Sequence, residues 1–261
     1  MSVFRKILTG AVALPFAIGL GASAYAQAKA TPTAAPATKP DADALAALNK
    51  MGEALRALSG FTITADVTTE QVLDSGQKLQ YGGDVKIEVQ RPGAFKIWTK
   101  SDHQERELYY DGKSLTVFAP KVGYYASVPA PATISATLDT ISDKYGLEVP
   151  LADLFSLGVD PALTAKIQSG FDVGPAMVAG KACEHYAFRQ EEADWQVWIR
   201  SEGPALPCKM VITTTQDEAQ PQYTAVMTWE ATAPPQAAYT FTPPANAHRI
   251  TLADVAAASA K

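Results

Sequence analysis

Residues 61–68 read FTITADVT, a stretch in which every second side chain is apolar. In an extended chain, the apolar members from Phe61 to Val67 would share one face, and the threonines and Asp66 would share the other. A period of two is typical of a strand with one buried and one solvated face. The stretch therefore predicts an antiparallel sheet with one apolar side.

The same alternation recurs on both sides of this stretch. Residues 85–89 read VKIEV, and Phe95 and Ile97 continue the pattern after a Pro-Gly pair. Asp111-Gly112 separates two short apolar runs and predicts a hairpin. Further strands are expected near residues 108–110, 115–118, 122–128, 171–178, 182–190, 194–201, 208–216, 222–230 and 238–242.

An amphipathic helix is predicted before the first strand. Asp41 is a plausible N-cap, leucines and Met51 recur at three- and four-residue spacing up to Leu58, and Gly60 provides a stop. We interpret this helix as core packing; a lid over a pocket is the alternative.

Helical spacing returns in the middle of the chain. Apolar residues from Ile134 to Tyr145 fit a helix that ends at Gly146. Pro150 then opens a shorter helical segment that closes at Gly158. Strands, a helical insert and further strands indicate an α+β fold built on one large antiparallel sheet.

The two ends of the chain are expected to lie outside a single domain at residues 41–252. Residues 1–26 have the basic start, apolar centre and Ala24-Tyr25-Ala26 site of a secretory signal peptide, cleaved near Ala26. A membrane anchor is the alternative, but the apolar run is short for spanning. Residues 27–40, rich in Ala, Pro and Thr, predict a flexible linker, and residues 253–261 a frayed tail.

Composition excludes several classes of function. The formal net charge of −5 falls to −7 without the signal peptide, so the basic footprint of a nucleic-acid-binding protein is absent. Two Cys and three scattered His favour no metal site. No G-x-S-x-G elbow or phosphate-binding glycine loop occurs. We therefore predict a non-enzymatic protein with no catalytic residue, metal or cofactor, and no transmembrane segment in the mature chain.

Cys183 and Cys208 are candidates for one structural disulfide in an exported protein. They fall on the first and third strands of a predicted meander, about 10 Å apart if the sheet is flat. A disulfide requires Cα atoms within about 7 Å. The bridge therefore needs strong curvature, or a segment at Pro204–Pro207 that folds across the end of the middle strand.

Trp195 and Trp198 lie three positions apart in another predicted strand. Regular alternation places them on opposite faces of the sheet. If one of them packs in the core, the other is exposed or lines a second surface.

Several short segments of the sequence resemble those of an uncharacterised family of predicted periplasmic bacterial proteins. They are YDGKSL at 110–115, KYGLEVPLADL at 144–154, CEHYAFR at 183–189, DWQVWI at 194–199 and PCKMVIT at 207–213. That family is similar in fold to the lipoprotein carriers LolA and LolB. The resemblance implies an open, strongly curved antiparallel sheet, a half-barrel, with helices over its concave face. The carriers hold acyl chains in that concavity.

Together these patterns predict a periplasmic protein that binds a lipid, an acyl chain or another apolar molecule, such as a lipid or lipoprotein carrier. The alternative is an envelope sensor or protein-interaction module on the same fold, marked by an exposed apolar patch or sheet edge. The candidate cavity residues, on one face of the strands and on the covering helices, are Phe61, Ile63, Val67, Val85, Ile87, Phe95, Ile97, Leu115, Val117, Leu138, Ile141, Leu154 and Phe155.

Overall fold

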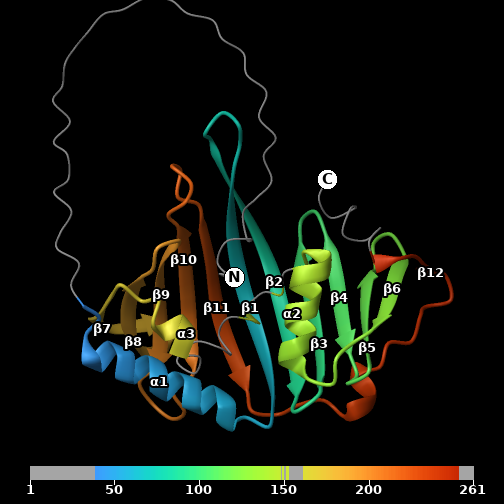
Figure 1. Cartoon of the computed structure of the whole chain (residues 1–261), viewed down its shortest axis with the longest axis horizontal. Coiled ribbons are helices and arrows are strands. Elements are labelled where there is room, and N and C mark those ends of the chain that lie inside the picture. Colours follow the sequence, from blue (N-terminus) through green and yellow to red (C-terminus); the bar gives the residue numbers. More distant parts are fainter. Residues whose placement is uncertain (1–38, 148, 150, 153–160, 253–261) are drawn as a thin grey trace, which may run out of the picture.

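The structure, a computed structural model, describes residues 39–147, 149, 151–152 and 161–252. Within these ranges twelve strands form one sheet in the order β12-β6-β5-β4-β3-β2-β1-β11-β10-β9-β8-β7 (Figure 1). The strands are β1 (Gly60–Val72), β2 (Lys78–Gln90), β3 (Ala94–Ser101), β4 (Glu105–Tyr110), β5 (Ser114–Ala119), β6 (Tyr124–Pro129), β7 (Ser169–Val178), β8 (Lys181–Arg189), β9 (Ala193–Arg200), β10 (Pro207–Thr214), β11 (Gln222–Glu230) and β12 (His248–Arg249).

The sheet is open, because among the described strands β12 and β7 end the order without pairing with each other. Most neighbouring strands are joined by a short turn and pair antiparallel. In the middle of the sheet, β1 pairs with β2 through a hairpin on one side. On its other side β1 pairs with β11, a strand that lies far from it in the sequence. Ile63 lies opposite both Ile87 and Trp229. β12 runs parallel to β6.

The helices placed in the described ranges are α1 (Ala42–Ala57), α2 (Ile134–Tyr145), α3 (Pro161–Thr164) and the 3-10 helix η3 (Gln236–Tyr239). α1 and α2 lie on the same side of the sheet, and their buried side chains join one apolar cluster with the strands. The predicted fold class, an α+β domain with an open antiparallel sheet and helices over one face, is confirmed.

The two ends of α1 differ from the sequence prediction. Asp41 occupies the N-cap position, but its side chain makes no capping hydrogen bond. Its backbone N–H instead donates to the carbonyl of Gly170 at 2.8 Å and ties the helix start to β7. Gly60 does not stop the helix, which ends at Ala57. Gly60 begins β1, where an added Cβ would approach the Cβ of Ala233 to 2.7 Å.

α2 has the ends that its sequence predicts. The Thr133 side chain accepts a hydrogen bond from the backbone N–H of Ala136. Gly146 closes the helix in the left-handed region, with φ 62°, and Leu147 donates back to the carbonyl of Ile141 at 3.2 Å. This pattern is the glycine-terminated helix end that leaves an apolar residue directly after it. Leu147 is accordingly buried.

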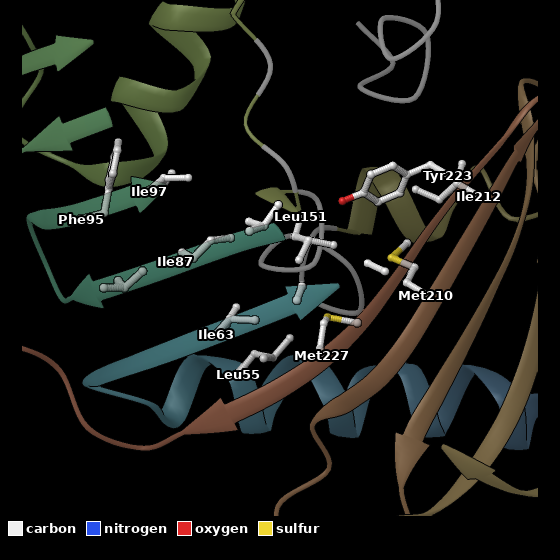
Figure 2. Packing of buried hydrophobic residues seen from close by; sticks show 14 of the residues in the cluster. Leu55, Ile63, Ile87, Phe95, Ile97, Leu151, Met210, Ile212, Tyr223 and Met227 are labelled. Atoms are coloured by element: carbon white, nitrogen blue, oxygen red, sulfur yellow. The ribbon is translucent and has the colours of Figure 1, made fainter. Parts of the chain in front are cut away.

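The apolar side of the sheet, which we call the inner face, carries the core of the protein. Figure 2 shows side chains from β1, β2 and β3 and from β10 and β11 directed into one shared interior. Leu55 of α1 lies against Ile63 and Met227 in that view. Because all these side chains belong to one cluster, the two halves of the sheet enclose a single core.

Residues 238–242 are not a strand: a 3-10 turn ends at Tyr239, with Ala238 donating to the carbonyl of Pro235 at 2.9 Å. The N–H groups of Ala238 and Thr240 donate locally, to Pro235 and Ala237, so they are not available for a strand ladder. The predicted signal peptide, most of the linker, the tail, and most of the segment opened by Pro150 lie outside the described residues.

Candidate functional site

The structure gathers the sequence-predicted cavity residues on the inner face. Val67 on β1 and Leu138 on α2 are partly buried against the cluster. Leu154 and Phe155 lie outside the described residues. The remaining candidates are 2% exposed or less: Phe61, Ile63, Val85, Ile87, Phe95, Ile97, Leu115, Val117 and Ile141. Their role in binding a ligand stays a prediction.

Sequence reasoning missed the other half of the inner face. The strands β8 to β11 contribute buried residues that extend the same cluster. The signal was present, because residues 195, 197 and 199 and residues 223 to 229 alternate as regularly as the first strand. The missed residues are Phe188, Trp195, Val197, Ile199, Met210, Ile212, Tyr223, Ala225, Met227 and Trp229.

Polar atoms occur within this apolar surface. The Trp195 indole nitrogen and the Tyr223 hydroxyl are buried without a hydrogen-bond partner in the described part of the chain. Burial raises the pKa of Tyr223 well above its usual value. The phenol therefore stays protonated at physiological pH and keeps a hydrogen to donate.

The two tryptophans of β9 lie on opposite faces, as the alternation predicts. Trp195 is fully buried on the inner face, where its ring stacks on Phe188 with centroids 4.3 Å apart. Trp198 lies on the outer face between His185, with ring centroids 3.9 Å apart, and Lys209, whose Nζ lies 4.7 Å from the ring centroid. The outer face therefore has an aromatic surface of its own.

The disulfide between Cys183 and Cys208 forms in the structure, with Cα atoms 7.0 Å apart. The cysteines belong to β8 and β10, which flank β9. The ladder between β9 and β10 shifts register between Pro207 and Lys209, so Cys208 lies in a bulge at the strand start. Arg200 at the end of β9 donates to the carbonyl of Leu206 at 3.0 Å. The bridge thus crosses the end of the middle strand, one of the two arrangements expected.

The outer face of β4, β5 and β6 is covered by the C-terminal segment. The Phe241 ring lies 5.2 or 5.3 Å from the rings of Tyr109, Phe118 and Tyr125. Tyr239, just before it, is fully buried. Burial and the nearby Glu88 carboxylate raise the pKa of Tyr239 to about 12. The inner face of the same strands carries the apolar core instead.

Other classes of site find little support in the described ranges. No group of three His, Cys, Asp or Glu side chains there could hold a metal ion. His103 and His248, like His185, each lie against an aromatic ring. A polar hollow of about 190 Å³ lies at Asp66, Asp84, Lys100 and their neighbours. No described helix is long and apolar enough to cross a bilayer.

A family described as predicted periplasmic proteins, DUF2092, matches residues 44–253. The chain belongs to the DUF2092 family. The family resemblance seen in the sequence is therefore confirmed. The match runs from α1 to β12, so the inner face lies within the part of the chain shared with the DUF2092 family. No curated protein matches this DUF2092 chain.

Several solved structures are similar in fold to the DUF2092 chain. LprF from Mycobacterium bovis is 18% identical, with 81% of this chain and 100% of that one covered and a TM-score of 0.45. MucB in the Pseudomonas aeruginosa MucA/MucB complex is 16% identical, with 77% and 62% covered and a TM-score of 0.43. A LolA superfamily protein from Nitrosomonas europaea is 10% identical, with 76% and 97% covered and a TM-score of 0.37. The DUF2092 chain thus spans under two thirds of the MucB chain. All three TM-scores lie below 0.5.

Proposed function

We propose that this DUF2092 protein is an exported, non-enzymatic binding protein that holds a lipid, acyl chain or other apolar molecule against the inner face of its sheet. The observation that carries the proposal is the continuity of that face. Buried apolar side chains extend over β1 to β6 and β8 to β11 in one cluster. A continuous apolar surface on an open sheet suits a ligand without strong polar groups.

The two helices that cover the inner face, α1 and α2, are attached to it by unequal amounts of apolar burial. α1 buries Leu48, Met51 and Leu55 almost completely, whereas Ile141 is the fully buried apolar side chain of α2. At about 1.5–3 kcal/mol for each large apolar side chain, α1 is attached by roughly 4.5–9 kcal/mol and α2 by roughly 1.5–3 kcal/mol before the partly buried residues of either helix are added. α2 is therefore the cover that lifts at the lower cost and would admit a ligand.

The family description supports the place of action. The signal peptide predicted at residues 1–26 and the description of the family as predicted periplasmic proteins both support export to the periplasm. There the protein would meet the lipids and acylated proteins of the envelope, and a lipid or lipoprotein carrier is the specific form of the proposal.

Native mass spectrometry of the gently purified mature chain tests the proposal. We expect bound phospholipid or fatty acid, and uptake of a fluorescent fatty acid by delipidated protein. Ile141→Ala should speed uptake because it loosens α2, whereas the exposed change Lys144→Ala on the same helix should leave the rate unchanged. A folded protein that retains no lipid and takes up no fatty acid would contradict the proposal.

A second candidate function rests on the edge strand β7. Phe171 and Val173 are 51% and 49% exposed on this last strand of the sheet. Met177 is 68% exposed but lies on the other face from Phe171, because Phe171 pairs with Ala187 and Met177 with Ala182. A bulge between Asp172 and Gly174, with Pro175 after it, disfavours pairing of this edge with another strand. A partner would therefore use the side chains. Recovery of a periplasmic protein by the wild type but not by Phe171→Ser would favour this function, and equal recovery would count against it.

A further inference from the structure

One row of side chains crosses the inner face from β8 to β11. Phe188 lies opposite Trp195, Trp195 opposite Ile212, and Ile212 opposite Tyr223. Cross-strand partners are neighbours on one face, so these four side chains form a continuous surface. Gln190 follows Phe188 by two positions and is buried, which extends the same surface past the end of β8.

Three hydrogen-bond donors on this surface have no partner among residues 39–147, 149, 151–152 and 161–252. They are the indole N–H of Trp195, the amide nitrogen of Gln190 and the hydroxyl of Tyr223, whose side chains are 0%, 6% and 9% exposed. Figure 2 shows the Tyr223 hydroxyl turned into the interior, on the side where Leu151 lies. Folding strips water from these donors at a cost in free energy. Three such groups on one surface point to a ligand that accepts their hydrogens.

The charges around the donors define the ligand group. All three donors are neutral, and the row from Phe188 to Tyr223 contains no Lys or Arg. Glu192 lies in the hairpin that follows β8, and one of its carboxylate oxygens is buried with no hydrogen-bond partner among the described residues. This buried oxygen disfavours a second negative charge nearby. An uncharged acceptor with apolar chains on either side fits this surface, whereas a free carboxylate would lack a counter-ion.

We propose, on the basis of the function proposed above, that Tyr223, Trp195 and Gln190 are the polar end of the inner-face site and donate hydrogen bonds to the carbonyl oxygens of an ester- or amide-linked acyl group. The apolar remainder of the inner face takes the chain. The site then distinguishes acylated molecules, such as diacyl phospholipids and acylated proteins, from hydrocarbons of equal length.

Two phospholipids that differ only in their linkage test this inference. A diester phosphatidylethanolamine has carbonyl oxygens, and the diether analogue with the same chains and headgroup has none. Competition binding to the mature wild-type protein should favour the diester, by about two- to tenfold for each hydrogen bond. Palmitate and methyl palmitate are compared in the same way, and the methyl ester should bind more tightly.

Tyr223→Phe removes one donor and keeps the ring, so it should reduce the preference for the diester by about two- to tenfold. Tyr239→Phe is the matched control, because Tyr239 has another buried hydroxyl with no partner in the described part of the chain but lies in η3, away from the row. It should leave the preference unchanged. Thermal melting of both variants checks that they fold.

The outcomes separate this inference from the proposed function. A preference that falls in Tyr223→Phe and persists in Tyr239→Phe supports the donor site. Equal binding of diester and diether by the wild type overturns it and leaves the binding function standing, as does tighter binding of palmitate than of its methyl ester. Binding of neither phospholipid and neither palmitoyl compound overturns both.

Discussion

Reduction of the disulfide between Cys183 and Cys208 should destabilise the domain by an amount that follows from its place in the chain. The bridge closes a loop of 25 residues and crosses β9. In the chain-entropy model, a loop of this length removes about 12 cal/mol/K from the unfolded state, or about 3.5 kcal/mol at 25 °C. The loss should appear as a lower free energy of unfolding.

The expected change in melting temperature follows from the size of the domain. An unfolding entropy of about 2.1 cal/mol/K per residue gives residues 41–252 a total of about 0.45 kcal/mol/K. Loss of 3.5 kcal/mol should then lower Tm by about 8 °C. Differential scanning calorimetry resolves a change of this size easily.

Oxidised and reduced wild-type protein are the proper comparison. Both cysteines are buried against Val178, Trp198 and Val226, so replacing them would add a packing loss to the loss of the bond. The protein is reduced in denaturant and refolded with reductant present. The double variant Cys183→Ala with Cys208→Ala serves as the control, because reductant should not change its Tm.

Two results would refute the reasoning. If oxidised and reduced wild type melt within about 2 °C of each other, the bridge does not restrict the unfolded chain in the way supposed. If reductant lowers the Tm of the double variant as well, the effect belongs to the reductant and not to the bond.

Three further predictions concern packing and pH. Gly83→Ala should lower the free energy of unfolding in urea by about 1–3 kcal/mol, because the added Cβ would lie 2.7 Å from a carbonyl oxygen of β3. Gly82→Ala should change it little, because nothing lies within 4 Å of the Cβ added there. Equal losses in the two variants would contradict the clash. Leu48→Ala in α1 should lower the free energy of unfolding by about 2–5 kcal/mol, whereas Lys50→Ala, at an exposed position, should lower it by less than about 0.5 kcal/mol. The reverse order would place α1 outside the core. The pKa of Tyr239 is raised to about 12, so the contribution of its phenol to stability is complete below pH 10 and is lost as the pH rises toward 12. The urea midpoint of Tyr239→Phe should therefore fall less steeply over that pH interval than the midpoint of the wild type. An equal slope in both proteins would exclude the buried phenol as the cause of the fall.

The sequence predicted much of the fold because each signal was local. Alternation at Phe61 and Ile63, the Asp-Gly turn at 111–112, and the glycine after α2 depend on residues a few positions apart. Each was found where expected. The prediction failed at 238–242, where the N–H groups of Ala238 and Thr240 bond locally in a 3-10 turn. It also did not find β12, whose two residues are too few to show a period.

The candidate site was only half predicted, for a different reason. Period two tells which residues share a face of a strand, but it does not tell which strands are neighbours. The pairing of β1 with β11 joins segments that lie far apart in the sequence, and this pairing unites the two halves of the inner face. The row from Phe188 to Tyr223 depends on register in the same way.

The sequence by itself determined the fold class, the apolar side of each strand, the positions of α1 and α2, and the lack of a recognisable catalytic motif. Tertiary structure alone decided that one apolar face continues over β1 to β6 and β8 to β11. It also decided that Trp195, Gln190 and Tyr223 carry donors there with no hydrogen-bond partner among the described residues. The physical reason is that hydrophobic periodicity is set by adjacent residues, whereas burial and hydrogen bonding depend on which distant strands pair and in what register.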